Sequence, residues 1–184
     1  MNRFLWSSMG ALWALWVLAF LTRRARGPRQ RAATDRVSVW GIVLQSVAYW
    51  VVWSAGSFKW RDLESWRAGA FFPLAIAALA LIWTAIPALG KQWRLEAGVN
   101  VDHELIQTGP YRYLRHPIYA SMFALLLATS ALIARPRPFL LALVLFVAGT
   151  EIRVRSEDRL LAGCFGDRFS EYRRRVRAYV PWVR

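Results

Sequence analysis

Residues 109–119 read GPYRYLRHPIY and lead directly into an apolar run, Ile118–Ala134. A run of this length can cross the hydrocarbon core of a bilayer, which takes about 17–25 helical residues. Ionisable groups at the mouth of a membrane helix are costly, and they usually have a functional reason. An interfacial anchor would use the Tyr and Arg residues, but it gives no role to His116 or Pro117. The stretch therefore predicts a functional site at the end of a membrane span.

Four further apolar runs complete the pattern, and they predict an all-α, polytopic membrane protein of about five transmembrane helices. The last run is short, and we expect it to continue as helix through residues 151–155 and out into water. The first run is Trp-rich and has no cleavage site behind it, which favours a span over a signal peptide. We expect a single domain over 1–184, with three spans in 1–89 and a core of two spans and a cytoplasmic tail in 90–184. The four runs are Phe4–Leu21, Val37–Phe58, Ala68–Leu89 and Phe139–Thr150.

The charge pattern predicts the orientation of the chain in the membrane. The formal net charge is +14, and 19 of the 25 Lys and Arg residues lie in 22–36, 90–117 and 151–184. Basic loops face the cytoplasm, so we expect the N-terminus outside and the C-terminus inside, in a prokaryotic inner membrane. The Arg residues stand between apolar runs, which argues against nucleic acid as a partner. One Cys and two His residues argue against a metal site.

The C-terminal part predicts how two distant charged segments meet. Pro-containing residues 135–138 form a short turn, so spans four and five are expected to be antiparallel and adjacent. This arrangement brings His116 close to residues 151–158. Beyond them, an apolar spacing of three or four residues over 161–176 predicts an amphipathic helical tail, interrupted near 164–167 by glycines.

Two signatures in this half of the chain resemble those of the isoprenylcysteine carboxyl methyltransferase family, which is related to the phospholipid N-methyltransferases. The first signature comprises His103, Leu105, Gly109, Tyr111, Arg115, His116, Pro117 and Tyr119. The second comprises Arg153, Glu157, Asp158, Phe165, Gly166, Phe169, Tyr172 and Pro181. A shorter upstream match, L-G-x-x-W, is formed by Leu89, Gly90 and Trp93. Asp158, Phe169 and Ala120 depart from the family's usual Glu, Tyr and Gly.

The resemblance implies an enzyme that uses S-adenosylmethionine as its methyl donor. The absence of a G-x-G-x-x-G motif after a strand agrees, because it excludes a Rossmann-type site. Arg153 is expected to hold the carboxylate of a lipophilic acceptor, with Glu157 orienting Arg153 or the donor. These two residues are the predicted catalytic pair. The predicted donor-binding residues are His103, Leu105, Gly109, Tyr111, Arg115, His116, Pro117, Tyr119, Glu157 and Asp158.

Other functions remain open at this point. The acceptor could be an isoprenylcysteine-like carboxylate, a phosphatidylethanolamine-type amine or a small thiol. An amine would need a base, for which Glu157 or His116 could serve. A reductase related to the membrane sterol reductases would need more than about five spans. A non-catalytic scaffold or lipid-binding protein is the alternative outside enzymology.

Overall fold

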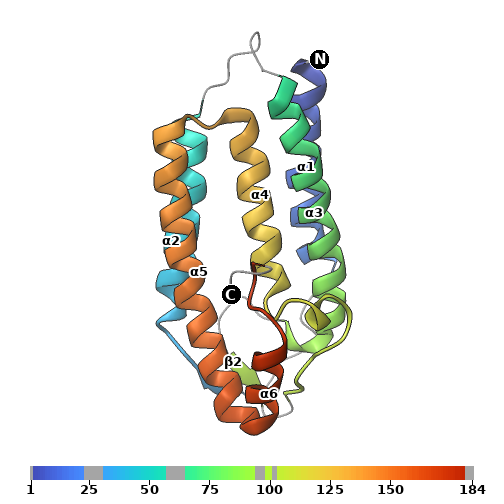
Figure 1. Ribbon diagram of the computed structural model, residues 1–184, viewed down its shortest axis with the longest axis vertical. Helices are drawn as coiled ribbons and strands as arrows, with labels where there is room; N and C mark the ends of the chain where they lie inside the picture. The colour runs from blue at the N-terminus through green and yellow to red at the C-terminus, as the bar shows by residue number, and fades with distance from the viewer. Residues whose placement is uncertain (1, 23–30, 57–64, 94–97, 101–102, 181–184) are drawn as a thin grey trace.

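The computed structural model describes residues 2–22, 31–56, 65–93, 98–100 and 103–180. The described chain is a bundle of long, roughly parallel helices with smaller elements gathered at one end (Figure 1). The α-helices are α1 Asn2–Leu21, α2 Ser38–Ser54, α3 Ser65–Leu89, α4 Pro117–Ile133, α5 Pro136–Phe165 and α6 Asp167–Arg175. The short elements are β1 Arg31–Thr34, β2 Gly98–Asn100 and the 3-10 turns η1 Gly90–Gln92 and η2 Gly109–Arg112.

Each of the five apolar runs contains a helix in the described residues, and two of these helices are long and apolar enough to cross a membrane. These two segments are Arg3–Leu21 in α1 and Trp66–Leu89 in α3, whereas α2 and α4 are shorter apolar helices. The number of spans therefore stays a prediction. Residues 57–64, which include the end of the second apolar run, much of the basic segment 22–36, and Pro181 of the second signature lie outside the described residues.

Helix α5 continues well past its apolar part, as the sequence predicted, and ends at Phe165. Gly166 follows with a φ of 52°, a backbone conformation that favours glycine, and α6 starts at the next residue. The interruption predicted near 164–167 is confirmed. Helix α6 carries Phe169 and Tyr172 on its buried side.

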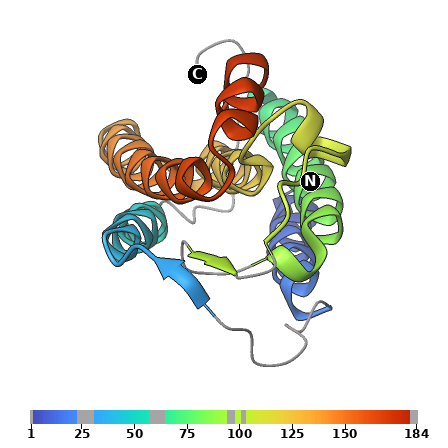
Figure 2. The same cartoon turned by 90° about the horizontal axis from the view of Figure 1, so that it is seen from below.

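Spans four and five were expected to be adjacent, and this is wrong for most of their length, because α4 and α5 make few contacts with each other. Helices α4 and α5 run antiparallel on either side of a two-residue turn, but α5 packs chiefly on α2, and α4 packs chiefly on α3 (Figures 1 and 2). The α2–α5 contact is close because both helices have glycine at the crossing. A Cβ at Gly149 would lie 2.7 Å from the carbonyl oxygen of Gly41, and one at Gly41 would lie 2.4 Å from Cγ of Arg153. The aliphatic part of Arg153 therefore rests on α2.

The short elements close the end of the bundle that holds the charged residues. Strands β1 and β2 pair antiparallel, which joins the connector after α1 to the one after α3. The chain after α6 returns to the start of α4, where the Arg115 and His116 amides donate to the carbonyl oxygens of Arg177 at 2.7 Å and Ala178 at 2.8 Å. This pairing fixes the backbone just ahead of α4.

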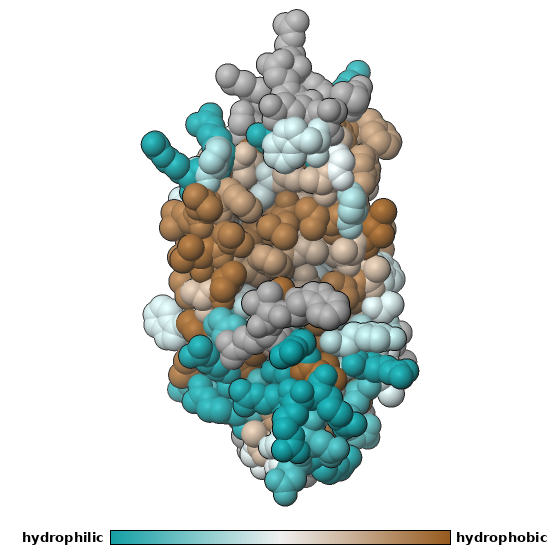
Figure 3. Space-filling model, viewed as in Figure 1, coloured by the Kyte–Doolittle hydropathy of each residue, from teal (hydrophilic) through white to brown (hydrophobic). Residues whose placement is uncertain are grey.

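On the face that Figure 3 shows, the bundle is apolar over its middle and hydrophilic at the end that carries α6. Large apolar side chains are exposed on four of the long helices, which is unusual for a surface in water. They include Leu15, Leu18, Trp40, Val43, Trp50, Ile76, Trp83, Leu140, Leu141 and Val144.

Candidate active site

His116 lies between two carboxylates at the start of α4. Its Nδ1 is 3.1 Å from Oε2 of Glu157, and its Nε2 is 3.0 Å from Oδ1 of Asp158. Glu157 and Asp158 are successive residues of α5, one turn beyond Arg153. The predicted approach of the start of α4 to the charged end of α5 is confirmed by these contacts.

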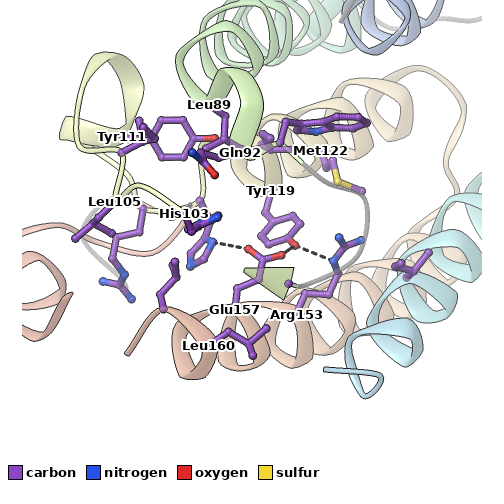
Figure 4. A pocket seen from close by; sticks show the side chains of 18 of the residues that line it. Leu89, Gln92, His103, Leu105, Tyr111, Tyr119, Met122, Arg153, Glu157 and Leu160 are labelled. Carbon is purple, nitrogen blue, oxygen red and sulfur yellow. Dashed lines mark hydrogen bonds and ion pairs between the residues drawn. The ribbon is translucent and has the colours of Figure 1, made fainter. Parts of the chain in front are cut away.

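Tyr119 connects this cluster to Arg153. Its hydroxyl donates to Oε1 of Glu157 and accepts a hydrogen bond from Nε of Arg153 at 2.8 Å (Figure 4). The guanidinium carbon of Arg153 lies 4.9 Å from the centre of the Tyr119 ring, a cation–π contact. Arg153 is only 6% exposed, so its charge is held by buried neighbours and not by water.

Arg115 secures the cluster from the other side. Its Nη2 donates to Oδ2 of Asp158 at 3.1 Å, and its Nη1 donates to the carbonyl oxygen of Val176 at 2.5 Å. The hydroxyl of Tyr172 in α6 donates to the carbonyl oxygen of Tyr111 at 2.5 Å. The C-terminal segment is thereby part of the site, and its contacts hold Arg115 and η2 in place.

Interactions within the cluster shift the pKa values of His116, Glu157 and Asp158. Burial lowers the pKa of His116, but hydrogen bonds and charge from Asp158 and Glu157 outweigh burial and raise it above its usual value. Burial raises the pKa of Glu157 and of Asp158, but contacts with His116, together with Arg153 for Glu157 and Arg115 for Asp158, leave both below their usual values. The ionised form of each group is therefore favoured.

A cavity of about 420 Å³ opens beside the cluster. This volume lies within the range of about 300–1,000 Å³ that is typical of small-molecule sites. The predicted residues that line it are His103, Leu105, Tyr111, Arg115, His116, Tyr119, Arg153 and Glu157. Gly109, Pro117 and Asp158 do not line it: Gly109 turns the backbone at a φ of 59°, Pro117 starts α4, and Asp158 pairs with Arg115 and His116.

The cavity has an apolar part that the signatures did not predict. Its walls there come from α1, α2 and α4 and include Trp16, Phe20, Ile42, Tyr49 and Met122. The first two helices thus contribute directly to the site. One residue in the sequence could have indicated this part of the cavity. Gln45 lies within the second apolar run, where burying a polar side chain costs free energy.

Two glutamines that line the cavity were not among the site residues predicted from the sequence. Gln45 donates from Nε2 to Oγ1 of Thr150 at 2.8 Å, and its Oε1 has no hydrogen-bond partner within the described chain. Gln92, in η1, is 4% exposed, and neither of its amide atoms has a partner there. Gln92 occupies a variable position of the L-G-x-x-W match, so nothing in that motif singled it out.

The fold and site are those of a helical protein with an apolar exterior and a charged, partly closed cavity at one end. The model of the isoprenylcysteine carboxyl methyltransferase (ICMT) family matches residues 71–163 of the 184, just over half of the chain. The chain belongs to this family. The match runs from α3 into the last turn of α5 and includes the whole His116–Glu157–Asp158 cluster.

Curated relatives carry two kinds of name. The chain is 34% identical over 85 residues to protein-S-isoprenylcysteine O-methyltransferase of Schizosaccharomyces pombe, covering 46% of this chain and 36% of the relative. It is 26% identical over 147 residues to nickel-cobalt-cadmium resistance protein NccN of Alcaligenes xylosoxydans xylosoxydans, covering 79% of this chain and 64% of the relative. Cobalt-zinc-cadmium resistance protein CzcN of Cupriavidus metallidurans is 25% identical over 147 residues, with 79% and 63% covered. The chain thus spans less than two thirds of the length of each of these relatives.

Proposed function

We propose that the chain is an S-adenosylmethionine-dependent methyltransferase of the membrane interface that methylates the carboxylate of an isoprenylcysteine-like or other lipophilic acceptor. One observation carries the proposal. The cavity joins a hydrogen-bonded chain of charged and polar groups, from His116 through Glu157 and Tyr119 to Arg153, to an apolar compartment walled by α1, α2 and α4. A polar donor and a lipophilic acceptor need those two environments side by side.

The polar part suits the groups of S-adenosylmethionine. When bound, this cofactor supplies an electrophilic methyl group on a sulfonium. Arg115 Nε is buried and has no hydrogen-bond partner among the described residues, so it can donate to the cofactor's carboxylate. Glu157 can attract the ammonium or the sulfonium, and Tyr111 offers an aromatic face. His103 and Leu105 add to the wall, whereas Gly109, Pro117 and Asp158 hold the lining residues in position.

Arg153 is the residue proposed to hold the acceptor. A carboxylate is already ionised near neutral pH, so the chain needs no base to activate it. Its task is to align the carboxylate and to remove water around it. The Tyr119 hydroxyl binds Nε of Arg153 and thereby turns the guanidinium to a fixed orientation. Glu157, which accepts from the same hydroxyl, is proposed to orient Arg153 through Tyr119.

The exposed apolar belt supports embedding in a bilayer. We propose five spans, formed by α1 to α4 and the apolar part of α5, with the N-terminus outside and the charged end in the cytoplasm of a prokaryotic cell. The basic residues favour that side. The cavity then faces the compartment that contains the methyl donor. The acceptor's lipid part would occupy the apolar compartment.

The test is methyl transfer by the purified chain in nanodiscs with methyl-labelled S-adenosylmethionine. N-acetyl-S-farnesylcysteine serves as the acceptor, and its cysteinamide analogue, which lacks the carboxylate, serves as the matched control. We expect label only with the free carboxylate, in a product that releases methanol in base, as a methyl ester does. Base-stable label on phosphatidylethanolamine or on a hydrophobic thiol, with none on any carboxylate, would refute the carboxylate assignment.

The relatives named for metal resistance do not alter the proposal. Within the described residues, no group of three or more His, Cys, Asp or Glu side chains is arranged to hold a metal ion. Both ring nitrogens of His116 contact carboxylates, so neither nitrogen is free to coordinate a metal ion.

A further inference from the structure

Gln92 presents an unpaired amide to the cavity. It is the last residue of η1, directly after α3, and its side chain points into the cavity near Leu89 and Tyr111 (Figure 4). Only 4% of the residue is exposed, and within the described chain neither Nε2 nor Oε1 has a hydrogen-bond partner. Leaving such a buried polar group unpaired is unfavourable. A ligand that pairs with both atoms removes this cost.

The other polar side chains of the cavity indicate which part of a ligand would pair with Gln92. Arg115 and Glu157 are charged, and His116 is bound to Glu157, so these groups suit the charged end of the methyl donor. Gln45 is neutral, but its Nε2 is committed to Thr150, which leaves one acceptor atom. Gln92 alone among these offers a free neutral donor and a free neutral acceptor side by side, in the described part of the chain.

We propose that the Gln92 amide recognises the adenine ring of the methyl donor. Its oxygen would accept a hydrogen bond from the 6-amino group, and its nitrogen would donate one to ring nitrogen N7. Glutamine and asparagine read adenine in this bidentate way when they contact DNA bases. The cavity wall around Gln92 also includes Leu89, Trp93 and Tyr111, which supply flat apolar surface for a heterocycle. This inference rests on the proposed function, and it adds the residue that selects the adenine base.

The experiment compares two ligands on the purified chain in nanodiscs by calorimetry. One is S-adenosylhomocysteine, and the other is its purine analogue, in which hydrogen replaces the 6-amino group. We expect the wild-type chain to bind the analogue about 10- to 100-fold more weakly, the discrimination typical of a bidentate amide–base pair. In the Gln92→Met variant, which keeps the length of the side chain, we expect less than threefold discrimination.

Gln45→Met is the matched control, because it replaces the other cavity amide with the same side chain. It should retain the wild-type ratio between the two ligands. Equal affinity of the wild-type chain for both ligands would overturn the inference without any variant, and so would full discrimination in Gln92→Met. If Gln92→Met instead altered only the KM of the acceptor, its amide would pair with the acceptor and the inference would be wrong.

The outcomes separate this inference from the proposed function. Binding of S-adenosylhomocysteine without a role for Gln92 leaves the methyltransferase proposal intact. Absence of binding by the wild-type chain overturns both.

Discussion

Replacing Arg153 by Lys keeps the positive charge but removes the contacts that orient it. The variant loses the hydrogen bond from Nε to the Tyr119 hydroxyl, which is 2.8 Å long, and the stacking of the guanidinium on the same ring. A hydrogen bond to a charged group contributes about 1.5–3 kcal/mol, and a cation–π contact contributes about 0.5–1 kcal/mol. We therefore expect the variant to lose about 2–4 kcal/mol of transition-state stabilisation. This corresponds to a fall in kcat/KM for the acceptor of roughly 30- to 1,000-fold.

The assay measures kcat/KM with the carboxylate acceptor and, separately, the Kd of S-adenosylhomocysteine. Donor affinity should change by less than threefold, because Arg153 is assigned to the acceptor. Arg155→Lys is the matched control: Arg155 lies on the same helix, its side chain is 67% exposed, and it forms an ion pair with Glu151 one turn away. It should keep kcat/KM within twofold. Arg153→Lys with near-normal turnover, or with parallel losses of turnover and donor affinity, would refute the assignment.

Three further predictions concern the cluster, the bundle and the orientation. The pKa of His116 is raised, so its contribution to stability is full below its ordinary value of 6.5 and is lost as pH rises through the raised value. The lowered pKa values of Glu157 and Asp158 give stability that is present above 4.5 and 3.8 and lost in stronger acid. Thermal stability should therefore be highest at mildly acidic pH. In His116→Gln, the fall in thermal stability at higher pH should disappear. A pH profile unchanged from that of the wild-type chain would contradict the proposed charge interactions of His116. Gly149→Ala should destabilise the protein by about 1–3 kcal/mol, because the added Cβ clashes with α2. Gly10→Ala is the control and should not destabilise it, because a Cβ there has no neighbour within 4 Å. Thermal unfolding of the two variants measures the difference. Cys164 is exposed, so a membrane-impermeant maleimide should label it in inverted vesicles and not in intact cells; the reverse pattern would invert the topology.

The helices were predictable because each one carries its own signal. An apolar run such as Ala68–Leu89 is long enough to be recognised without its neighbours, and α3 ends at the same residue. The glycine interruption after Phe165 is equally local, since few residues besides glycine adopt the φ of Gly166. The meeting of His116 with the end of α5 followed from one short turn between two helices.

Contacts between distant segments were not predictable in the same way. The α2–α5 crossing depends on Gly41 and Gly149 coming face to face, and neither residue reveals its partner in the sequence. The return of the C-terminal segment to Arg115 likewise depends on backbone geometry that no periodicity records. Gln92 carries no motif, and only its burial without a partner marks it.

Binding of S-adenosylhomocysteine to the purified chain in nanodiscs tests the central claim most directly. The measurement is calorimetric titration of the wild-type chain and of His116→Ala, which removes the group that holds Glu157 and Asp158 in place. We predict saturable binding at one site per chain, weakened at least tenfold in the variant. No detectable binding by folded wild-type protein at millimolar ligand, or equal binding by the variant, would contradict the account.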